Sequence, residues 1–477
     1  MRAADARELT TMDLLGRTRF FGLLCALAGS VVAAGLSYAQ PAPGQMAPGS
    51  TPAAPPPNVF VPLPTPPATP SVAPRAAPGP ASAAQPANEA TGFPPAQPAP
   101  QPKVAKRKPK PKPPIREWAL SDDPTPSFQP ETFFATAAAS ERYAKIVDNG
   151  GWPKVPGNVG PKTKGAAIAA LRRRLDIEGD PNESVGRGDQ WDARLAAAVK
   201  HFQARNGLKQ TGIVSGATLR AINTSANVRF KQLASSSQRL AGVQFPFGER
   251  YVVVNIPSAA VEAIANGQVL KRYTAVVGDV DHRSPEVSTR ITAINLNPTW
   301  TLPTSIIKNE IIPKMRRDPG YLARSRIKIL DGRGTVIDPR SINWGSEKAV
   351  NYTLRQDSGT HNALGSIRIQ MTNKHAVYMH DTPSKGYFNR DYRFLSHGCV
   401  RVQGVWDLAA WLLEGSGNWD RASLIAQIGK ERQDLRLARP VPVVWVYMTG
   451  WASADGTVHF ADDVYQVDTI GMQADAR

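Results

Sequence analysis

Cys399 has the sequence surroundings of a reactive thiol. It lies in the hexapeptide Ser396-His397-Gly398-Cys399-Val400-Arg401, and a second histidine, His380, precedes it in the chain. A nearby imidazole can take the proton of a thiol, and the thiolate is the nucleophilic form of cysteine. A glycine before the cysteine lets the backbone approach a substrate closely. The pattern favours a cysteine nucleophile with a histidine base.

Two other roles for this thiol are compatible with the local residues. A free cysteine is frequently a small buried apolar residue, although the neighbours here are polar. His380, His397 and Cys399 could instead bind zinc, but a fourth ligand is not evident and structural zinc prefers several thiolates. The other cysteine, Cys25, lies in an apolar N-terminal run. If that run is removed on export, one thiol is left and no internal disulfide can form.

Residues 1–39 have the pattern of an export signal. Arg17 and Arg19 precede the almost wholly apolar stretch 20–36, and Ser37-Tyr38-Ala39 is a candidate cleavage site. This order of a basic region, an apolar region and small residues is typical of a signal peptide. Because the apolar stretch is slightly long, an uncleaved membrane anchor is the alternative. Either interpretation predicts a protein of the periplasm or cell envelope.

Residues 40–130 are predicted to be a disordered linker, because they are rich in Pro and Ala and poor in large apolar side chains. Residues 103–112 are strongly basic, and the whole chain carries a formal net charge of +18. Much of this excess lies in the linker, and no basic motif interleaved with aromatic residues is visible. We therefore expect no nucleic-acid partner, but weak attraction to a membrane or another anionic envelope surface.

The middle of the chain predicts helices. Residues 131–160 contain an amphipathic helical segment that is broken at Gly150-Gly151-Trp152-Pro153. Residues 161–228 form a second unit, with helices expected at 166–175, 194–206 and 216–223. Its strings 199–203 (Val-Lys-His-Phe-Gln) and 211–214 (Thr-Gly-Ile-Val) resemble the small three-helix peptidoglycan-binding domain. The resemblance implies contact with the cell wall, and an ordinary helical spacer is the alternative.

Residues 245–468 have the texture of strands. Asn266-Gly267 between two apolar runs predicts a hairpin, and Asp455-Gly456 predicts another that joins residues 441–448 to 457–460. Other expected elements are strands at 251–256, 291–296, 327–330, 366–371 and 376–379 and a helix at 405–413. The fold class is therefore a multidomain α+β chain. A small three-helix domain precedes a mostly-β domain in which Cys399 lies at a strand end.

The strings around the thiol carry a family resemblance. His380 together with residues 396–401 resembles the signature of the L,D-transpeptidase catalytic domain, of the YkuD type. Longer strings that strengthen the resemblance are residues 297–303, 318–322, 362–365 and 378–383. They are similar to the large periplasmic subgroup of Gram-negative bacteria, which also carries a peptidoglycan-binding unit.

The resemblance implies a reaction and a set of roles. Cys399 would attack the carbonyl after the third residue of a peptidoglycan stem peptide, the terminal D-alanine would leave, and a neighbouring stem amine would take the acyl group, giving a 3→3 cross-link. The family assigns the base to His380 rather than His397, and it forms a lid from about residues 305–360. Asp381 either orients His380 or turns the chain. Relatives are acylated by carbapenems.

Further residues are expected to contact substrate. The backbone N–H groups at Gly398 and the next residue are candidates for an oxyanion hole, and Arg401 for a stem carboxylate or for lowering the thiol pKa. The full expected set besides Cys399 and His380 is Gly398, His397, Ser396, Arg401 and Trp300. We expect no metal or other cofactor, and the sequence does not indicate an oligomeric state. The alternatives are an L,D-carboxypeptidase, an enzyme that attaches an envelope protein to peptidoglycan, and a non-catalytic wall-binding protein.

Overall fold

The computed structural model describes residues 116–180 and 184–469. The predicted export signal and the basic part of the linker lie outside these residues. All the described residues belong to one compact unit. Within the described ranges, no helix is both long enough and apolar enough to cross a membrane.

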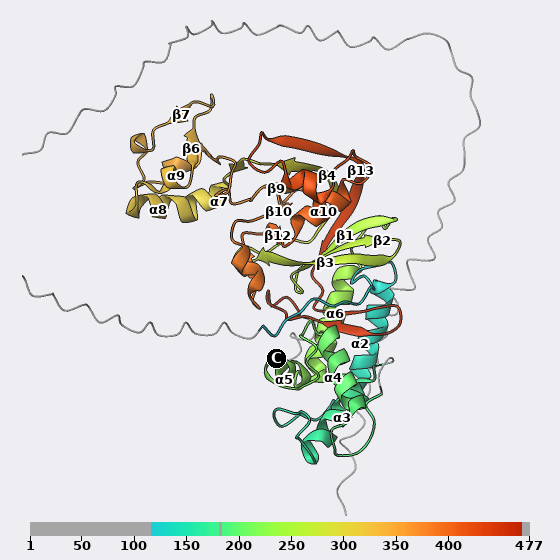
Figure 1. Cartoon of the computed structure of the whole chain (residues 1–477). Coiled ribbons are helices and arrows are strands. Elements are labelled where there is room, and N and C mark those ends of the chain that lie inside the picture. The colour runs from blue at the N-terminus through green and yellow to red at the C-terminus, as the bar shows by residue number, and fades with distance from the viewer. Residues whose placement is uncertain (1–115, 181–183, 470–477) are drawn as a thin grey trace, which may run out of the picture. The chain divides into compact units, whose positions relative to one another are not determined.

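Nine strands form the principal sheet (Figure 1). They are β1 (Arg250–Asn255), β2 (Ala260–Ala265), β3 (Gln268–Gly278), β4 (Val287–Leu296), β9 (Ile367–Met371), β10 (Met379–His380), β11 (Phe394–Ser396), β12 (Val400–Val402) and β13 (Gln433–Val446). Their order is β11-β3-β12-β10-β9-β4-β13-β1-β2, and β2 also pairs with β3. All strands except β11 therefore close into a ring. The fold confirms the mixed class with a β-rich C-terminal domain.

Strand alternation explains how this sheet is buried on both sides. On β1, Val252 and Val254 pack in the main apolar core, whereas Tyr251 and Val253 pack in a second core on the other face. Helix α10 (Val405–Leu412) adds its apolar side chains to the main core. Burying one such aliphatic side chain contributes about 1.5–3 kcal/mol. The predicted hairpin at Asn266-Gly267 is confirmed, and both residues have the positive φ that such a turn requires.

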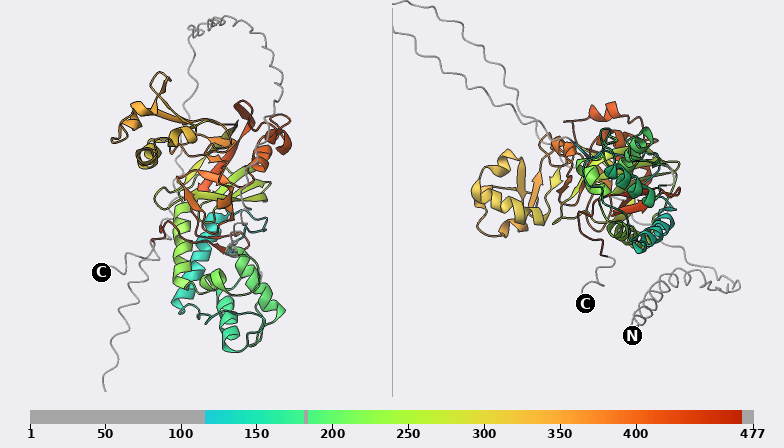
Figure 2. Two further views of the ribbon diagram at one scale, coloured as in Figure 1. Left: turned by 60° about the vertical axis from the view of Figure 1, so that its left-hand side comes forward. Right: turned by 90° about the horizontal axis from the view of Figure 1, so that it is seen from below.

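Residues 300–356, here called the lid because they overlap the lid predicted at about 305–360, have their own sheet and core. The sheet has the order β5-β8-β6-β7, with β5 (Trp300–Thr301), β6 (Ile327–Leu330), β7 (Val336–Ile337) and β8 (Thr353–Gln356). The helices are α7 (Thr304–Ile306), a π-helix (Ile307–Ile311), α8 (Ile312–Arg317) and α9 (Tyr321–Arg324). They pack as a separate cluster of elements in all views (Figure 2). The strand predicted at 327–330 belongs to this lid, because its partners are β7 and β8.

Within the described part of the chain, five helices precede the sheet. They are α2 (Thr132–Asp148), α3 (Ala166–Glu178), α4 (Ala193–Arg205), α5 (Gly216–Ile222) and α6 (Ala226–Leu240). The sequence analysis did not predict α6. Helices α2 and α6 share a core with the hairpin of β14 (Gly450–Ala452) and β15 (Val458–Phe460). The hairpin predicted between residues 441–448 and 457–460 was therefore wrong in its first strand. β15 pairs with β14, whereas residues 441–446 belong to β13 and pair with β1 and β4.

Residues 116–129, here called the strap, correct the predicted extent of the linker. They were expected to be disordered, but they make fixed contacts with the sheet and with the helices. The Arg272 guanidinium donates to the Thr125 carbonyl at 2.6 Å, and the Ser127 amide donates to the Glu262 carboxylate at 2.9 Å. Phe128 is buried in the second core. These partners are distant in sequence, so local composition alone does not reveal the strap.

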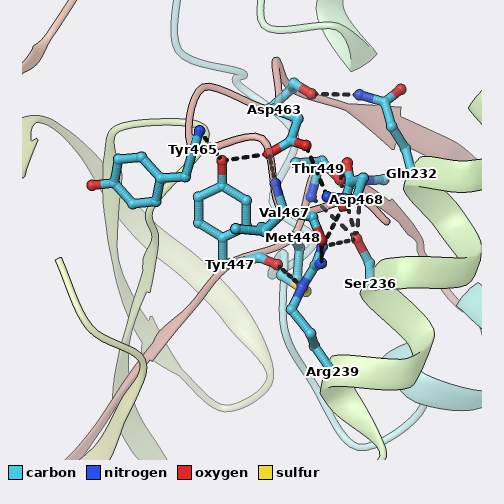
Figure 3. A network of polar contacts seen from close by, with 12 residues as sticks. Gln232, Ser236, Arg239, Tyr447, Met448, Thr449, Asp463, Tyr465, Val467 and Asp468 are labelled. Carbon is cyan, nitrogen blue, oxygen red and sulfur yellow. Dashed lines mark hydrogen bonds and ion pairs between the residues drawn. The ribbon is translucent and has the colours of Figure 1, made fainter. Parts of the chain in front are cut away.

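Helix α6 is joined to the C-terminal segment by buried polar contacts (Figure 3). Arg239 donates to the Tyr447 carbonyl at 2.9 Å and pairs with the Asp468 carboxylate at 2.8 Å. The Ser236 hydroxyl accepts from the Thr449 amide at 3.2 Å. Because these groups are buried and paired, they fix the helix on the strands rather than leaving it mobile.

Candidate active site

Pairing of β10 with β12 brings the predicted catalytic residues together. The two strands are parallel, with Met379 opposite Val400 and His380 opposite Arg401. Met379 and Val400 point into the main core. Side chains alternate between the faces of a strand. The opposite face, here called the catalytic face, therefore carries Tyr378, His380, Cys399 and Arg401.

The Cys399 thiol is protonated in the resting site. Burial raises its pKa to about 11, although the backbone and side chain of Tyr378 and the charge of Arg401 oppose this shift. The side chain of Tyr378 lies close enough to the thiol to lower the pKa of Cys399, and Trp300 in turn lowers the pKa of Tyr378 against the raising effect of burial. Tyr378 was not predicted from the sequence to be part of the site.

His380 is buried and neutral. Burial and, to a smaller extent, the nearby charge of Arg401 lower its pKa to about 3, although backbone groups of Asp381 and Leu364 oppose the shift. Its Nδ1 has no hydrogen-bond partner among the described residues, and no hydrogen bond joins its ring to Cys399 there. Catalytic hydrogen bonds are commonly long in substrate-free enzymes, so this geometry is compatible with a base that engages the thiol later.

Two serines hold the loop that ends at Cys399. The Ser396 hydroxyl accepts the Gly398 N–H at 3.2 Å and donates to the Cys399 carbonyl at 2.6 Å. The Gly398 carbonyl accepts a hydrogen bond from the Ser284 hydroxyl at 2.8 Å. Gly398 has a φ of 101°, which side-chain-bearing residues rarely adopt. The glycine in the motif is therefore required by the shape of the loop.

Asp381 acts on the chain around His380 rather than on its ring. Its carboxylate accepts the Ser366 amide at 3.2 Å and pairs with the Lys385 ammonium. A Cβ atom at Gly365 would lie 2.4 Å from the same carboxylate, so the two segments approach closely. These contacts support the turn after β10.

His397 pairs with the lid. Its Nε2 lies 2.9 Å from a carboxylate oxygen of Glu310, which belongs to the π-helix and also pairs with Lys314 at 2.6 Å. The hydrogen bond from His397 lowers the pKa of Glu310 to about 2, and the same bond raises the pKa of His397. The His282 ring lies 4.3 Å from the His397 ring, centroid to centroid. The histidine nearest to the thiol in sequence thus fastens the lid to the catalytic loop.

The catalytic face is rich in positive charge. The Arg401 guanidinium lies 5.6 Å from the centre of the Tyr387 ring, and its Nε has no hydrogen-bond partner among the described residues. On β9, Arg368 donates to Asn295 at 2.8 Å and lies 5.4 Å from the Tyr378 ring. Anionic groups are favoured where guanidinium groups are desolvated and incompletely paired.

The structure therefore brings together Cys399, His380, Arg401, Ser396 and Gly398, and it connects Trp300 to them through Tyr378. The sequence analysis missed Tyr378, Ser284 and Glu310. Alternation offered a signal for Tyr378, since it stands two positions before His380 on an extended segment. Nothing in the sequence pattern links the other two residues to the site.

The landmarks of the small helical unit have a structural role. Gln203 is buried, and its Nε2 lies 2.9–3.0 Å from the Thr211 hydroxyl, the Ile213 carbonyl and the Thr218 hydroxyl. Its Oε1 accepts the Gly212 amide at 2.8 Å. The Gln203 side chain therefore joins α4 to the following loop, and this contact gives the Phe-Gln and Thr-Gly strings a structural role.

Two family models match the chain. Residues 249–428 match the model described as "L,D-transpeptidase catalytic domain" (YkuD), and residues 154–222 match the one described as "Putative peptidoglycan binding domain". A curated protein of Haemophilus influenzae, named "Putative L,D-transpeptidase", is 33% identical over 239 residues. The match covers 50% of this chain, and the chain spans about half (48%) of the length of that relative.

Solved structures give weaker likenesses. An L,D-transpeptidase from Mycobacterium smegmatis is 17% identical, with a TM-score of 0.21 over 41% of this chain and 58% of the other. An L,D-transpeptidase from Stackebrandtia nassauensis is 11% identical, with a TM-score of 0.24 over 61% of this chain and 96% of the other. The assignment of the two domains therefore rests on the sequence matches.

Proposed function

We propose that this chain, whose residues 249–428 are an L,D-transpeptidase catalytic domain, cross-links peptidoglycan stems through a thioester on Cys399. The observation that carries the proposal is the catalytic face. The pairing of β10 with β12 places three groups side by side. They are the Cys399 thiol, the His380 imidazole and the Arg401 guanidinium, and a nitrogen of each of the last two has no hydrogen-bond partner among the described residues. That combination supplies a nucleophile, a proton acceptor and a carboxylate-binding group.

The resting pair of Cys399 and His380 is neutral, so activation accompanies substrate binding. The charge of Arg401 lowers the pKa of His380. A stem carboxylate bound at Arg401 would offset that charge and make the imidazole a stronger base. His380 then takes the thiol proton as the sulfur attacks the donor carbonyl, and it returns the proton to the departing D-alanine amine.

The second half of the reaction transfers the acyl group. An amine on a neighbouring stem attacks the thioester carbonyl, His380 accepts the amine proton, and the sulfur leaves as thiolate that regains a proton. Water competes with the amine, and an L,D-carboxypeptidase is therefore the second candidate. The lid would favour the amine, since its Glu310 pairs with His397 beside the nucleophile and a covered site restricts water.

The same proposal assigns residues 154–222 to wall binding. Since Gln203 and its partners are used internally, the surface that contacts peptidoglycan lies elsewhere on this unit. We infer a periplasmic enzyme that the helical unit keeps near its polymeric substrate. The test is co-sedimentation of the full chain with purified sacculi at moderate salt, compared with a chain that lacks residues 154–222.

Replacement of the nucleophile tests the core of the proposal. Wild-type protein incubated with disaccharide-tetrapeptides should give 3→3 dimers and free D-alanine, and Cys399→Ala should give neither while keeping its melting temperature. Intact-protein mass spectrometry should detect an acyl adduct that maps to Cys399. Product formation by Cys399→Ala would disprove the assignment.

Trimming the lid separates the two candidates. Thr301 pairs with Arg355 across β5 and β8, so a short glycine-rich turn can join them and remove the intervening residues. If the lid excludes water, the trimmed enzyme should release more tripeptide for each 3→3 dimer, measured by liquid chromatography. An unchanged ratio in a folded trimmed enzyme would leave the lid without a part in acceptor choice.

A further inference from the structure

A buried hydrogen-bonded bracket lies behind the nucleophile loop. It consists of Gly278 at the end of β3, Ser284 in the following turn and Tyr465 in the C-terminal segment. The Tyr465 hydroxyl donates to the Gly278 carbonyl at 2.7 Å and accepts the Ser284 amide at 3.1 Å. The Ser284 hydroxyl accepts the Gly278 amide at 2.9 Å and donates to the Gly398 carbonyl at 2.8 Å.

The bracket is rigid as well as buried. Ser284 is 4% exposed and Tyr465 is 3% exposed. A Cβ atom at Gly278 would lie 2.2 Å from the His282 carbonyl oxygen, so the turn is packed against the strand with no space for a side chain. Tyr465 is itself stacked on Tyr447, with ring centroids 5.0 Å apart, and the Tyr447 hydroxyl donates to the Asp463 carboxylate at 2.8 Å (Figure 3).

The contact with Gly398 fixes the direction of one peptide group. The carbonyl of Gly398 and the N–H of Cys399 belong to the same planar unit and point in opposite directions. Because Ser284 holds the carbonyl, the N–H of Cys399 is directed away from the bracket. The flanking backbone groups are also hydrogen-bonded. The Ser396 hydroxyl accepts from the Gly398 N–H and donates to the Cys399 carbonyl. The Val400 N–H donates to the Tyr378 carbonyl at 3.1 Å.

The amide of Cys399 is the exception in this run. It has no hydrogen-bond partner within residues 116–180 and 184–469. An unpartnered N–H on the residue that carries the nucleophile is a donor for an oxyanion formed at that nucleophile. Its orientation is already set before any substrate binds.

We propose that Ser284, supported by Tyr465, is a positioning residue that presets the Cys399 N–H as an oxyanion donor. Neither residue touches the substrate, and Tyr465 lies beyond the residues 249–428 that match the catalytic family model. The proposal rests on the function proposed above, in which the thiol attacks a carbonyl. In that attack the sulfur forms a bond to carbon, the carbonyl electron pair moves to oxygen, and the bound N–H stabilises the resulting charge.

Two reactions of the same thiol separate this role from a general structural one. Iodoacetamide alkylates a thiolate by displacing iodide and forms no oxyanion. p-Nitrophenyl acetate acylates it through a tetrahedral oxyanion that collapses to a thioester and p-nitrophenolate. Both rates are measured on the full chain, with the peptide containing Cys399 followed by mass spectrometry so that Cys25 does not contribute.

In Ser284→Ala we expect acylation of Cys399 to fall about 10- to 100-fold, whereas alkylation changes less than about twofold. Tyr465→Phe should lower the same ratio of acylation to alkylation by a smaller factor. Ser236→Ala is the matched control, because Ser236 is a similarly buried serine of α6 whose hydroxyl accepts from the Thr449 amide and does not contact the loop. It should keep the wild-type ratio.

The proposal is overturned if Ser284→Ala keeps the wild-type ratio, or if both of its rates fall together. If Ser284→Ala does not fold, the ratio in Tyr465→Phe decides the question in the same way. Because neither probe is a peptidoglycan fragment, a lowered ratio supports the bracket even if the chain fails to cross-link muropeptides. Loss of muropeptide turnover alone would count only against the proposed substrate.

Discussion

Two buried polar clusters in this chain differ in how their charges are balanced. In the helical region, Glu178 accepts hydrogen bonds from Tyr143 at 2.8 Å, Arg174 at 2.9 Å and Arg205 at 2.5 Å. The cluster is completed by the Trp152 ring, which lies 3.5 Å from the Arg174 guanidinium. On the catalytic face, by contrast, no carboxylate of the described residues pairs with Arg401, and His380 keeps an unpartnered nitrogen.

The difference separates a structural cluster from a functional one. Burial alone would raise the pKa of Glu178, but the charges of Arg174 and Arg205 lower it well below its ordinary range. The carboxylate therefore stays charged and holds the helices together. On the catalytic face, burial lowers the pKa of His380 and raises that of Cys399, and the neighbouring groups only partly oppose these shifts. Its unsatisfied groups are available to a substrate.

The largest effect is expected where the balanced cluster is broken. Glu178→Ala leaves Arg174 buried without its counter-charge and leaves Arg205 with Asp180 alone, at 3.1 Å, which costs about 3–5 kcal/mol. We expect calorimetry to show a markedly lower melting temperature of the helical region, with acylation of Cys399 by p-nitrophenyl acetate almost unchanged at 25 °C. Glu347→Gln, which breaks the exposed pair with Lys308 in the lid, is the control and should cost at most about 1 kcal/mol.

The next effect concerns the base on the catalytic face. His380→Ala should slow acylation by a disaccharide-tetrapeptide about 100-fold or more, the range for a lost general base. The melting temperature is measured alongside, because removing a buried imidazole also leaves a cavity, and the slowing is assigned to the lost base only if the variant stays folded at 25 °C. His397→Ala should slow the same reaction less. If His397→Ala were the slower variant, the roles of the two histidines would be reversed.

A smaller effect should follow from removing the unpaired charge. Arg401→Gln keeps much of the side-chain volume but loses the guanidinium that would bind a stem carboxylate. A hydrogen bond to a charged group contributes about 1.5–3 kcal/mol, so KM for the tetrapeptide should rise about 10- to 100-fold with a smaller change in kcat. The same variant should raise the pKa of His380, measurable by NMR. An unchanged KM would remove Arg401 from substrate binding.

The smallest effect is expected at the contact between lid and loop. Because the bond to Glu310 raises the pKa of His397, the pair is present below that pKa and is lost as pH rises through it. The pair is also lost when the pH falls below the pKa of Glu310, at about 2, because the carboxylate is then protonated. Glu310→Gln should therefore change tetrapeptide turnover a few-fold near pH 6 and have no effect at high pH. An effect that is constant across the pH range would exclude the ion pair as its cause.

Local patterns predicted much of the fold, and the residues predicted to be catalytic lie on paired strands within it. The strands at 251–256 and 291–296 and the Asn266-Gly267 turn could be predicted because their signals depend on neighbours in the chain. The hairpin at Asp455-Gly456 was assigned to the wrong partner, since β13 was long enough to pair elsewhere. Ser284, Glu310 and the strap could not be predicted, because each acts through a residue that is distant in sequence.

Tyr465 has a consequence for when the enzyme becomes reactive. Synthesis proceeds from the N-terminus, so the loop of Cys399 leaves the ribosome well before the phenol that supports it from behind. A chain stopped after residue 428 would contain every position of the catalytic family match and still lack this support. The nucleophile would therefore be fully supported only after the segment around Tyr465 has folded back onto β3.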